Sequence, residues 1–164
     1  MQILKMGDEV LRRNCLPIER VDENVRTLVG DMFVTLEMSG GIGLAAPQVG
    51  YNIRLFIVKL DDMDGMVCIN PQIIQTSDSV CTMEEGCLSI PKIYEKVSRP
   101  KEITLQYMDI NGKKQLLTAD GLLARVIQHE NDHLNGVLFL DRIDDAKREK
   151  AIAKFEKLMR KVRN

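Results

Sequence analysis

Residues 120–136 read DGLLARVIQHENDHLNG, and this stretch holds both histidines of the chain, His129 and His133. The apolar residues before them recur with helical spacing, Asp120 is a suitable N-cap, and an Asn-Gly pair supplies a stop. At positions i and i+4 of a helix, two imidazoles lie on one face a single turn apart and can share one metal ion. Glu130, directly after the first histidine, can then reach a water on that metal. The stretch therefore predicts a metal-binding helix held against the protein by its apolar face.

The composition is that of an ordinary folded protein. Hydrophobic residues make up 45% and charged residues 29% of the 164 residues, which fits one domain over residues 1–164. The formal net charge of −1 gives no sign of DNA or membrane binding, and no apolar run approaches the roughly 18 residues of a membrane span. Residues 1–8 lack the apolar stretch of a signal peptide, so the cytoplasm is the expected compartment. Three of the four cysteines, Cys15, Cys68 and Cys81, are best explained as buried thiols, since none belongs to a C-x-x-C pair.

Periodicity elsewhere predicts a mixed fold. A first helix is expected from an Asp22 cap to about Met38, and a third helix over about 144–162. Strands are expected at 54–60, 66–70, 103–110 and 115–118, the last two joined by Asn111-Gly112, a strong hairpin signal. Because few strands alternate with helices, we expect the α+β class, with mainly antiparallel sheets around a central metal-binding helix, a long N-terminal helix and a C-terminal helix.

A catalytic site of this kind needs a third protein ligand besides the two histidines. One class of H-E-x-x-H protease uses a third histidine, but Phe139 occupies that position here. A second class takes a glutamate from a later helix, where Glu149 and Glu156 are available; in such a charged segment they are better explained as surface ion-pair partners. The remaining candidate is Cys87, in a tight glycine-containing segment between likely strands, because a thiolate is a strong ligand for iron(II) or zinc.

A further motif, GIGLAAPQVG, covers residues 41–50. Its glycine spacing is wrong for a phosphate-binding loop, and it lacks the Gly-Lys-Ser/Thr sequence of that loop. Small residues followed by an amide suit a backbone edge against which a ligand lies, with Gln48 as a donor. A turn into a buried strand explains the same stretch equally well.

Together, GIGLAAPQ (41–48), EGCLS (85–89) and QHENDHLNG (128–136) resemble the signature set of the peptide deformylases, in that family's order. The resemblance covers essentially the whole chain, and a short form with a C-terminal helix is similar to the bacterial type. It implies a hydrolase that removes the N-formyl group from the formyl-methionine start of nascent proteins and releases formate.

The resemblance also implies roles for individual residues. The implied ligands of one divalent metal ion are Cys87, His129 and His133. Iron(II) is the ion expected in the cell, and zinc, nickel or cobalt can replace it in purified protein. Glu130 would take a proton from water and return it to the departing amine. The side-chain amide of Gln48 and the backbone N–H of Leu88 would hold the oxyanion.

The implied substrate is an N-formylmethionyl peptide that binds as an added strand. Its implied binding residues are Ile42, Gly43, Leu44, Leu122 and Val126. The first three would offer their backbone, and the methionine pocket would use the side chains at 42, 122 and 126; plain core packing explains these side chains equally well. Arg125 stands near the expected pocket rim, where many relatives carry an apolar residue.

The C-terminal segment has its own implication. From Asp144 onward it contains eight Lys/Arg and four Asp/Glu residues, a net charge of +4. In bacterial relatives this element helps docking at the ribosome exit, so the ribosome is an expected partner, with a solvated helix face as the alternative. A small H-E-x-x-H protease and a structural metal site or inactive binding relative also stay open. Phe139 disfavours the first, and the presence of Glu130 and Gln48 disfavours the second.

Overall fold

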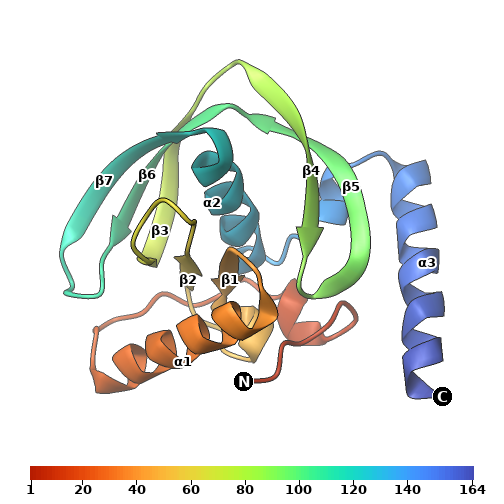
Figure 1. Cartoon of the computed structure of the whole chain (residues 1–164). Coiled ribbons are helices and arrows are strands. Elements are labelled where there is room, and N and C mark those ends of the chain that lie inside the picture. Colours follow the sequence, from red (N-terminus) through yellow and green to blue (C-terminus); the bar gives the residue numbers. More distant parts are fainter.

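The helix that carries both histidines, α2 (Gly121–Leu134), lies between a five-stranded sheet and a separate hairpin in the computed structural model, which describes residues 1–164 (Figure 1). The sheet has the order β1-β2-β3-β6-β7, and each neighbouring pair is antiparallel. Its strands are β1 (Gly43–Ala45), β2 (Leu55–Val58), β3 (Met66–Thr76), β6 (Glu102–Met108) and β7 (Lys114–Asp120). The hairpin consists of β4 (Val80–Cys87) and β5 (Ile90–Pro100). The predicted α+β class is confirmed.

Two further helices flank this arrangement. Helix α1 (Glu23–Ser39) packs against β1 and β2 and begins after Asp22, whose side chain accepts a hydrogen bond from the Val25 backbone N–H at 3.0 Å. Helix α3 (Asp145–Arg163) packs on the outer side of β5 and begins after Asp144 (Figure 1). Both predicted helices are therefore confirmed to within about one residue. Three short 3-10 helices complete the chain: η1 (Glu9–Arg12), η2 (Ala46–Val49) and η3 (Phe139–Arg142). None of the helices is both long and apolar enough to cross a membrane.

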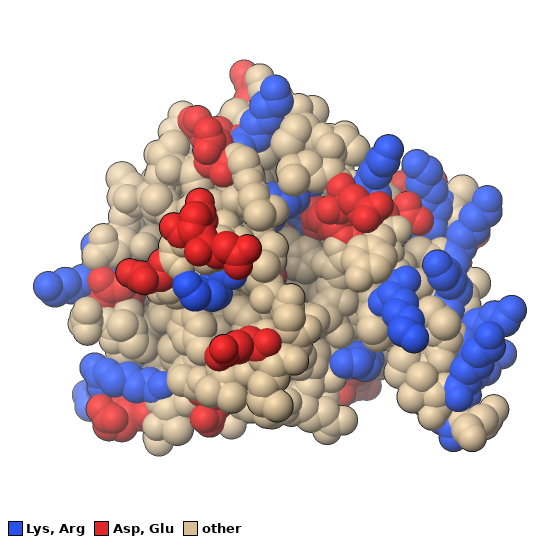
Figure 2. All heavy atoms as spheres, viewed as in Figure 1, with Lys and Arg blue, Asp and Glu red and all other residues tan.

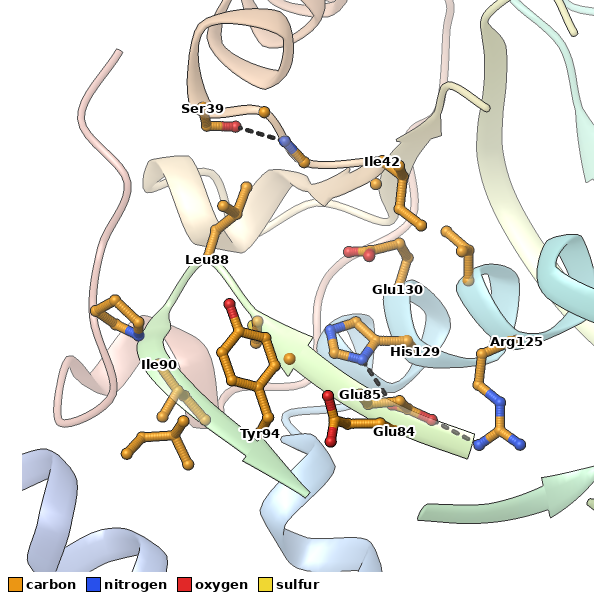
Figure 3. A pocket seen from close by; sticks show the side chains of 18 of the residues that line it. Ser39, Ile42, Glu84, Glu85, Leu88, Ile90, Tyr94, Arg125, His129 and Glu130 are labelled. Carbon is orange, nitrogen blue, oxygen red and sulfur yellow. Dashed lines mark hydrogen bonds and ion pairs between the residues drawn. The ribbon is translucent and has the colours of Figure 1, made fainter. Parts of the chain in front are cut away.

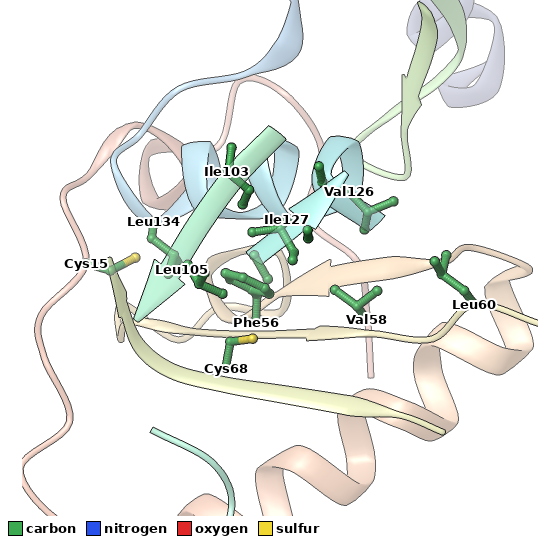
Figure 4. Packing of buried hydrophobic residues seen from close by; sticks show 13 residues of the cluster. Cys15, Phe56, Val58, Leu60, Cys68, Ile103, Leu105, Val126, Ile127 and Leu134 are labelled. Atoms are coloured by element: carbon green, nitrogen blue, oxygen red, sulfur yellow. The ribbon is translucent and has the colours of Figure 1, made fainter. Parts of the chain in front are cut away.

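The apolar face of α2 packs directly on the sheet (Figure 4). Phe56 of β2 and Leu105 of β6 are completely buried in one cluster with Ile127 of α2. Burial of each such side chain stabilises the fold by about 1.5–3 kcal/mol. Cys15 and Cys68 belong to the same cluster, where burial raises the pKa of Cys15 to about 11 and that of Cys68 still further. These two are thus buried neutral thiols, as predicted, whereas Cys81 is half-buried.

The structure departs from the sequence prediction in several places, among them β3, which runs to Thr76 and not to residue 70. The tight segment expected around Cys87 is the end of the β4–β5 hairpin, and only Leu88-Ser89 separates the strands. Half of the residues of β4 are exposed and only Glu85 is buried, so the strand lacks the apolar alternation that would have revealed it. Asp120 is the N-cap residue of α2, as predicted, but its side chain accepts no capping hydrogen bond. Asp120 is still paired in β7, and the turn into α2 is made at Gly121, which has φ +58°.

Candidate metal centre and active site

Cys87, at the end of β4, meets the two histidines of α2. Its Sγ lies 3.4 Å from Nε2 of His133, and ligand atoms of Cys87, His129 and His133 all lie within 4.8 Å of one another. A thiolate with two imidazoles is a donor set suited to zinc or iron(II). The three residues could therefore hold one divalent ion, and the docking of the hairpin against α2 brings them together.

Glu85 orients the first of these histidines. Its Oε1 lies 2.9 Å from Nδ1 of His129 (Figure 3). The same carboxylate accepts two hydrogen bonds from Arg99, at 2.6 and 3.0 Å, which keep it ionised. His129 must then donate from Nδ1, so the lone pair on Nε2 is available to a metal.

A chain of charged side chains continues behind the site; it is buried as far as Asp132, and Arg142 at its end is exposed. Burial alone would raise the pKa of Glu85, but hydrogen bonds from His129 and Arg99 lower it well below its usual value. Arg99 also donates to Asp132 at 2.8 Å, and Asp132 pairs with Arg142 from η3 at 2.8 Å. Because both carboxylates of this chain have guanidinium partners, the network holds the hairpin, α2 and η3 together.

The two histidines differ in their affinity for protons. Burial alone would lower the pKa of His129, but the charges of Glu130 and Cys87 and the hydrogen bond to Glu85 raise it well above the usual value. The pKa of His133 is lowered by burial and by its positively charged neighbours, and its Nδ1 is buried without a hydrogen-bond partner. Since a bound dication requires neutral imidazoles, metal binding would displace a proton from His129.

Glu130 points into the cavity beside His129 (Figure 3). Only 4% of the residue is exposed, and its Oε1 is buried without a hydrogen-bond partner. Burial raises the pKa of Glu130 to about 7. A carboxylate with a free oxygen and such a pKa can both accept and donate a proton near neutral pH.

Gln48 of η2 presents its amide to the same place. Its Oε1 accepts from the Ala45 backbone N–H at 2.9 Å, and its Nε2 donates to Ser89 Oγ at 3.1 Å. These partners fix the orientation of the amide, so that Nε2 also lies 3.6 Å from Sγ of Cys87. Gln48 thus directs a hydrogen-bond donor at the candidate metal centre.

A cavity of about 420 Å³ opens from this centre. Most of the residues expected to bind substrate line it: Ile42, Gly43, Leu122 and Val126, together with Leu88. Leu44 does not line it, because its side chain is completely buried in the cluster beneath α1. Strand β1 is an edge strand of the sheet, so its free side has backbone groups available for an extended peptide.

None of the alternative third ligands belongs to the group formed by Cys87, His129 and His133. Phe139 stacks on His129 with ring centroids 6.0 Å apart and offers no donor atom. Glu149 and Glu156 are exposed on α3.

Sequence reasoning missed Glu85, although its place two residues before Cys87 was a usable signal. It also placed Arg125 at the pocket rim; this residue does line the cavity, but it is only 5% exposed, because its guanidinium binds Glu85 and the Val97 carbonyl.

A family model described as polypeptide deformylase matches residues 1–149 of this chain. The chain belongs to the polypeptide deformylase family. It is 46% identical to a peptide deformylase of Treponema pallidum (strain Nichols) over 163 residues, which cover 99% of this chain and 100% of the relative. It is 50% identical over 149 residues to a peptide deformylase of Prochlorococcus marinus (strain NATL1A), covering 88% of this chain and 74% of that one.

Solved structures of the family share the fold of this chain. A peptide deformylase from Legionella pneumophila superposes with a TM-score of 0.92 at 41% identity, covering 97% of this chain and 95% of the other. A Synechococcus elongatus peptide deformylase, solved in complex with actinonin, gives a TM-score of 0.90 at 44% identity, with 94% and 85% covered. At these identities the likeness extends from fold to family, so the Cys/His/His cluster belongs to a metal-dependent hydrolase.

Proposed function

We propose that this protein removes the N-formyl group from the formyl-methionine start of nascent proteins and releases formate. The observation that carries the proposal is the convergence of Cys87, His129 and His133 with Glu130 and Gln48 at one end of a single cavity. The amide nitrogen of the substrate would leave as a free N-terminal amine.

A divalent ion held by Cys87, His129 and His133 would polarise the formyl carbonyl and lower the pKa of a water. We propose iron(II) as the ion in the cell, with zinc, nickel or cobalt able to replace it in purified protein. Glu130 accepts the proton of the attacking water at its free oxygen and returns it to the departing amine. Burial of Glu130 supports this role, because it holds the pKa near the working pH.

Two donors stabilise the negative charge that develops on the formyl oxygen. One is the Gln48 Nε2 amide, whose direction is set by Ala45 and Ser89. The other is the backbone N–H of Leu88, next to Cys87 in the cavity wall. Loss of one such donor costs about 10²–10³-fold in turnover in other enzymes.

The peptide would extend β1 as an added strand along the backbone of Ile42, Gly43 and Leu44. The free edge of β1 supports this arrangement. The methionine side chain would enter the apolar part of the cavity, between Ile42 on one side and Leu122 and Val126 of α2 on the other.

Formate release from formyl-Met-Ala-Ser by anaerobically prepared, iron-loaded protein tests the proposal. We expect turnover by the wild type and loss of both bound metal and turnover in Cys87→Ser. Cys81→Ser is the matched control, because Cys81 lies on the same strand but outside the candidate ligand group. Cleavage of internal peptide bonds without formate release would favour the protease alternative. Full metal occupancy in Cys87→Ser would refute the thiolate assignment.

We further propose that the protein works in the cytoplasm and docks on the ribosome through α3. Figure 2 shows Lys and Arg side chains gathered over this helix, and exposed basic residues on it include Lys154, Lys157, Arg160 and Lys161. Binding through RNA phosphates should weaken steeply with salt.

Replacement of these four basic residues of α3 by glutamate should abolish co-sedimentation with ribosomes at low salt. The same change at Lys113 and Lys114, in and beside the β6–β7 turn, is the control and should leave it intact; unchanged co-sedimentation of the α3 variant would refute docking.

A further inference from the structure

Arg125 is a buried cation of α2 whose donors face the β4–β5 hairpin. One guanidinium nitrogen donates to Glu85 Oε2 at 2.7 Å and to the Val97 carbonyl at 2.8 Å. The other donates to the Cys81 carbonyl at 2.8 Å. A single side chain of the histidine helix is thus bound to both strands of the hairpin that carries Cys87.

Glu85 connects this arginine to the metal centre. Its Oε2 accepts from Arg125 and Arg99, and its Oε1 accepts from Arg99 and His129. Figure 3 shows Glu85 between His129 and Arg125. Arg125 precedes His129 by four residues, so the two side chains lie one above the other on the same face of α2. They reach the same carboxylate from that face, whereas Arg99 reaches it from β5.

The candidate ligands come from two elements that share no sheet: one is a strand of the hairpin and the other is a helix. Cys87 ends β4, which pairs only with β5, and the histidines belong to α2. No backbone ladder sets the distance between sulfur and imidazoles. That distance depends on side chains that span the gap, and Arg125 spans it with three hydrogen bonds to oxygen.

We propose that Arg125 is a positioning residue for the metal centre: by fixing Glu85 and the β4–β5 hairpin against α2, it sets the orientation of His129 and its separation from Cys87. This inference rests on the proposed function, in which these residues bind the metal. Groups that orient a metal ligand from behind typically account for about 10- to 100-fold in metal affinity. We expect an effect of that size from Arg125, exerted through Glu85 and through the hairpin carbonyls that it binds.

The test uses the full chain with cobalt(II) as the probe. Its dissociation constant is measured by competition with a chromophoric chelator, and its absorption spectrum reports the ligand geometry. Arg125→Met should weaken cobalt binding by about 10- to 100-fold and shift the ligand-field bands. Arg142→Met is the control, because Arg142 binds a carboxylate of the same network, Asp132, but not Glu85. It should keep the wild-type spectrum and bind cobalt within about threefold of wild type.

A double-mutant cycle separates positioning from general stabilisation. Because part of the effect acts through Glu85, Arg125→Met should weaken cobalt binding by a smaller factor in the Glu85→Gln background than in the wild-type background. Equal effects of Arg125→Met in both backgrounds would overturn the proposal. If Arg125→Met does not fold, Arg125→Lys takes its place, because lysine keeps the charge but lacks the planar fork. Wild-type affinity and spectrum in a folded Arg125→Met or Arg125→Lys would also overturn it.

The outcomes for the two proposals are distinguishable. If wild-type protein binds cobalt without a thiolate charge-transfer band, the metal assignment of Cys87 fails, and the proposed function fails with it. If the wild type shows that band and Arg125 variants do not differ from it, only the role of Arg125 is lost.

Discussion

Replacement of Gly43 by alanine should disable the reaction while leaving the chain folded. An alanine Cβ at this position would stand 2.6 Å from Oε2 of Glu130 and 2.9 Å from Cγ1 of Val126. Ordinary contact with a Cβ begins near 3.4 Å, so the carboxylate would have to retreat by about 0.8 Å. Misplacement of a catalytic group by about 1 Å costs about 100-fold in rate. We therefore expect kcat/KM to fall by about 100-fold.

The same methyl group also affects stability. Overpacking of a tight site costs about 1–3 kcal/mol, which should leave most molecules folded at 25 °C. Gly30→Ala is the matched control, because Gly30 lies inside α1 and a methyl group there would meet no atom of another element within 4 Å. It should stabilise the protein by about 0.5–1 kcal/mol and leave the rate unchanged.

Formate release from formyl-Met-Ala-Ser, normalised to metal bound per chain, measures the effect on rate, and urea unfolding measures the effect on stability. The two variants make the same chemical change, so any difference in rate reports the surroundings of the glycine. Wild-type kcat/KM in Gly43→Ala with full metal content would refute the reasoning, because Glu130 would then not act from the position it holds.

Three other substitutions test separate parts of the structure. Glu130→Gln should retain bound metal, measured by elemental analysis, but lose about 10²–10⁴-fold in turnover, because it cannot accept a proton; retained turnover would exclude it as the base. Arg99→Met should lower the free energy of unfolding in urea by about 3–5 kcal/mol, because it leaves the buried Glu85 charge short of a partner; a loss below about 1 kcal/mol would contradict this. Asp141→Asn should lower stability at pH 7 but not at pH 2. Burial raises and the Arg12 hydrogen bond lowers the pKa of Asp141, with a net decrease, so its contribution exists above the unfolded pKa and is lost as the pH falls through the folded one. An equal difference at both pH values, measured by urea unfolding, would count against this ion pair.

Several parts of the fold could be predicted because the signals are local. The Asp22 cap and the apolar spacing after it predicted α1 almost to the residue, and Asn111-Gly112 predicted the β6–β7 hairpin. Strand β4 could not be found in this way. Half of its residues are exposed and only one is buried, and it is held by pairing with β5 and by charged contacts to α2.

The residues of the site likewise fall into those with a local sequence signal and those without one. The i, i+4 histidines and the glutamate between them predicted a metal-binding helix, because helical geometry alone decides which side chains share a face. Cys87 could be named as the third ligand only by comparing alternatives and by resemblance to a family. Glu85 stands two residues before Cys87, but nothing along the chain indicated its partners or those of Arg99, since these partners lie on other elements.

Sequence by itself thus determined the metal-binding helix, the two long helices and the class of the fold, all of which depend on periodicity within short segments. Tertiary structure alone decided that Arg125 is a buried link between α2 and the β4–β5 hairpin, and that Gly43 must lack a side chain beside Glu130. Both depend on which distant atoms approach within a few ångströms. Such distances are set by the packing of β1 and the β4–β5 hairpin against α2, and no spacing along the chain records them.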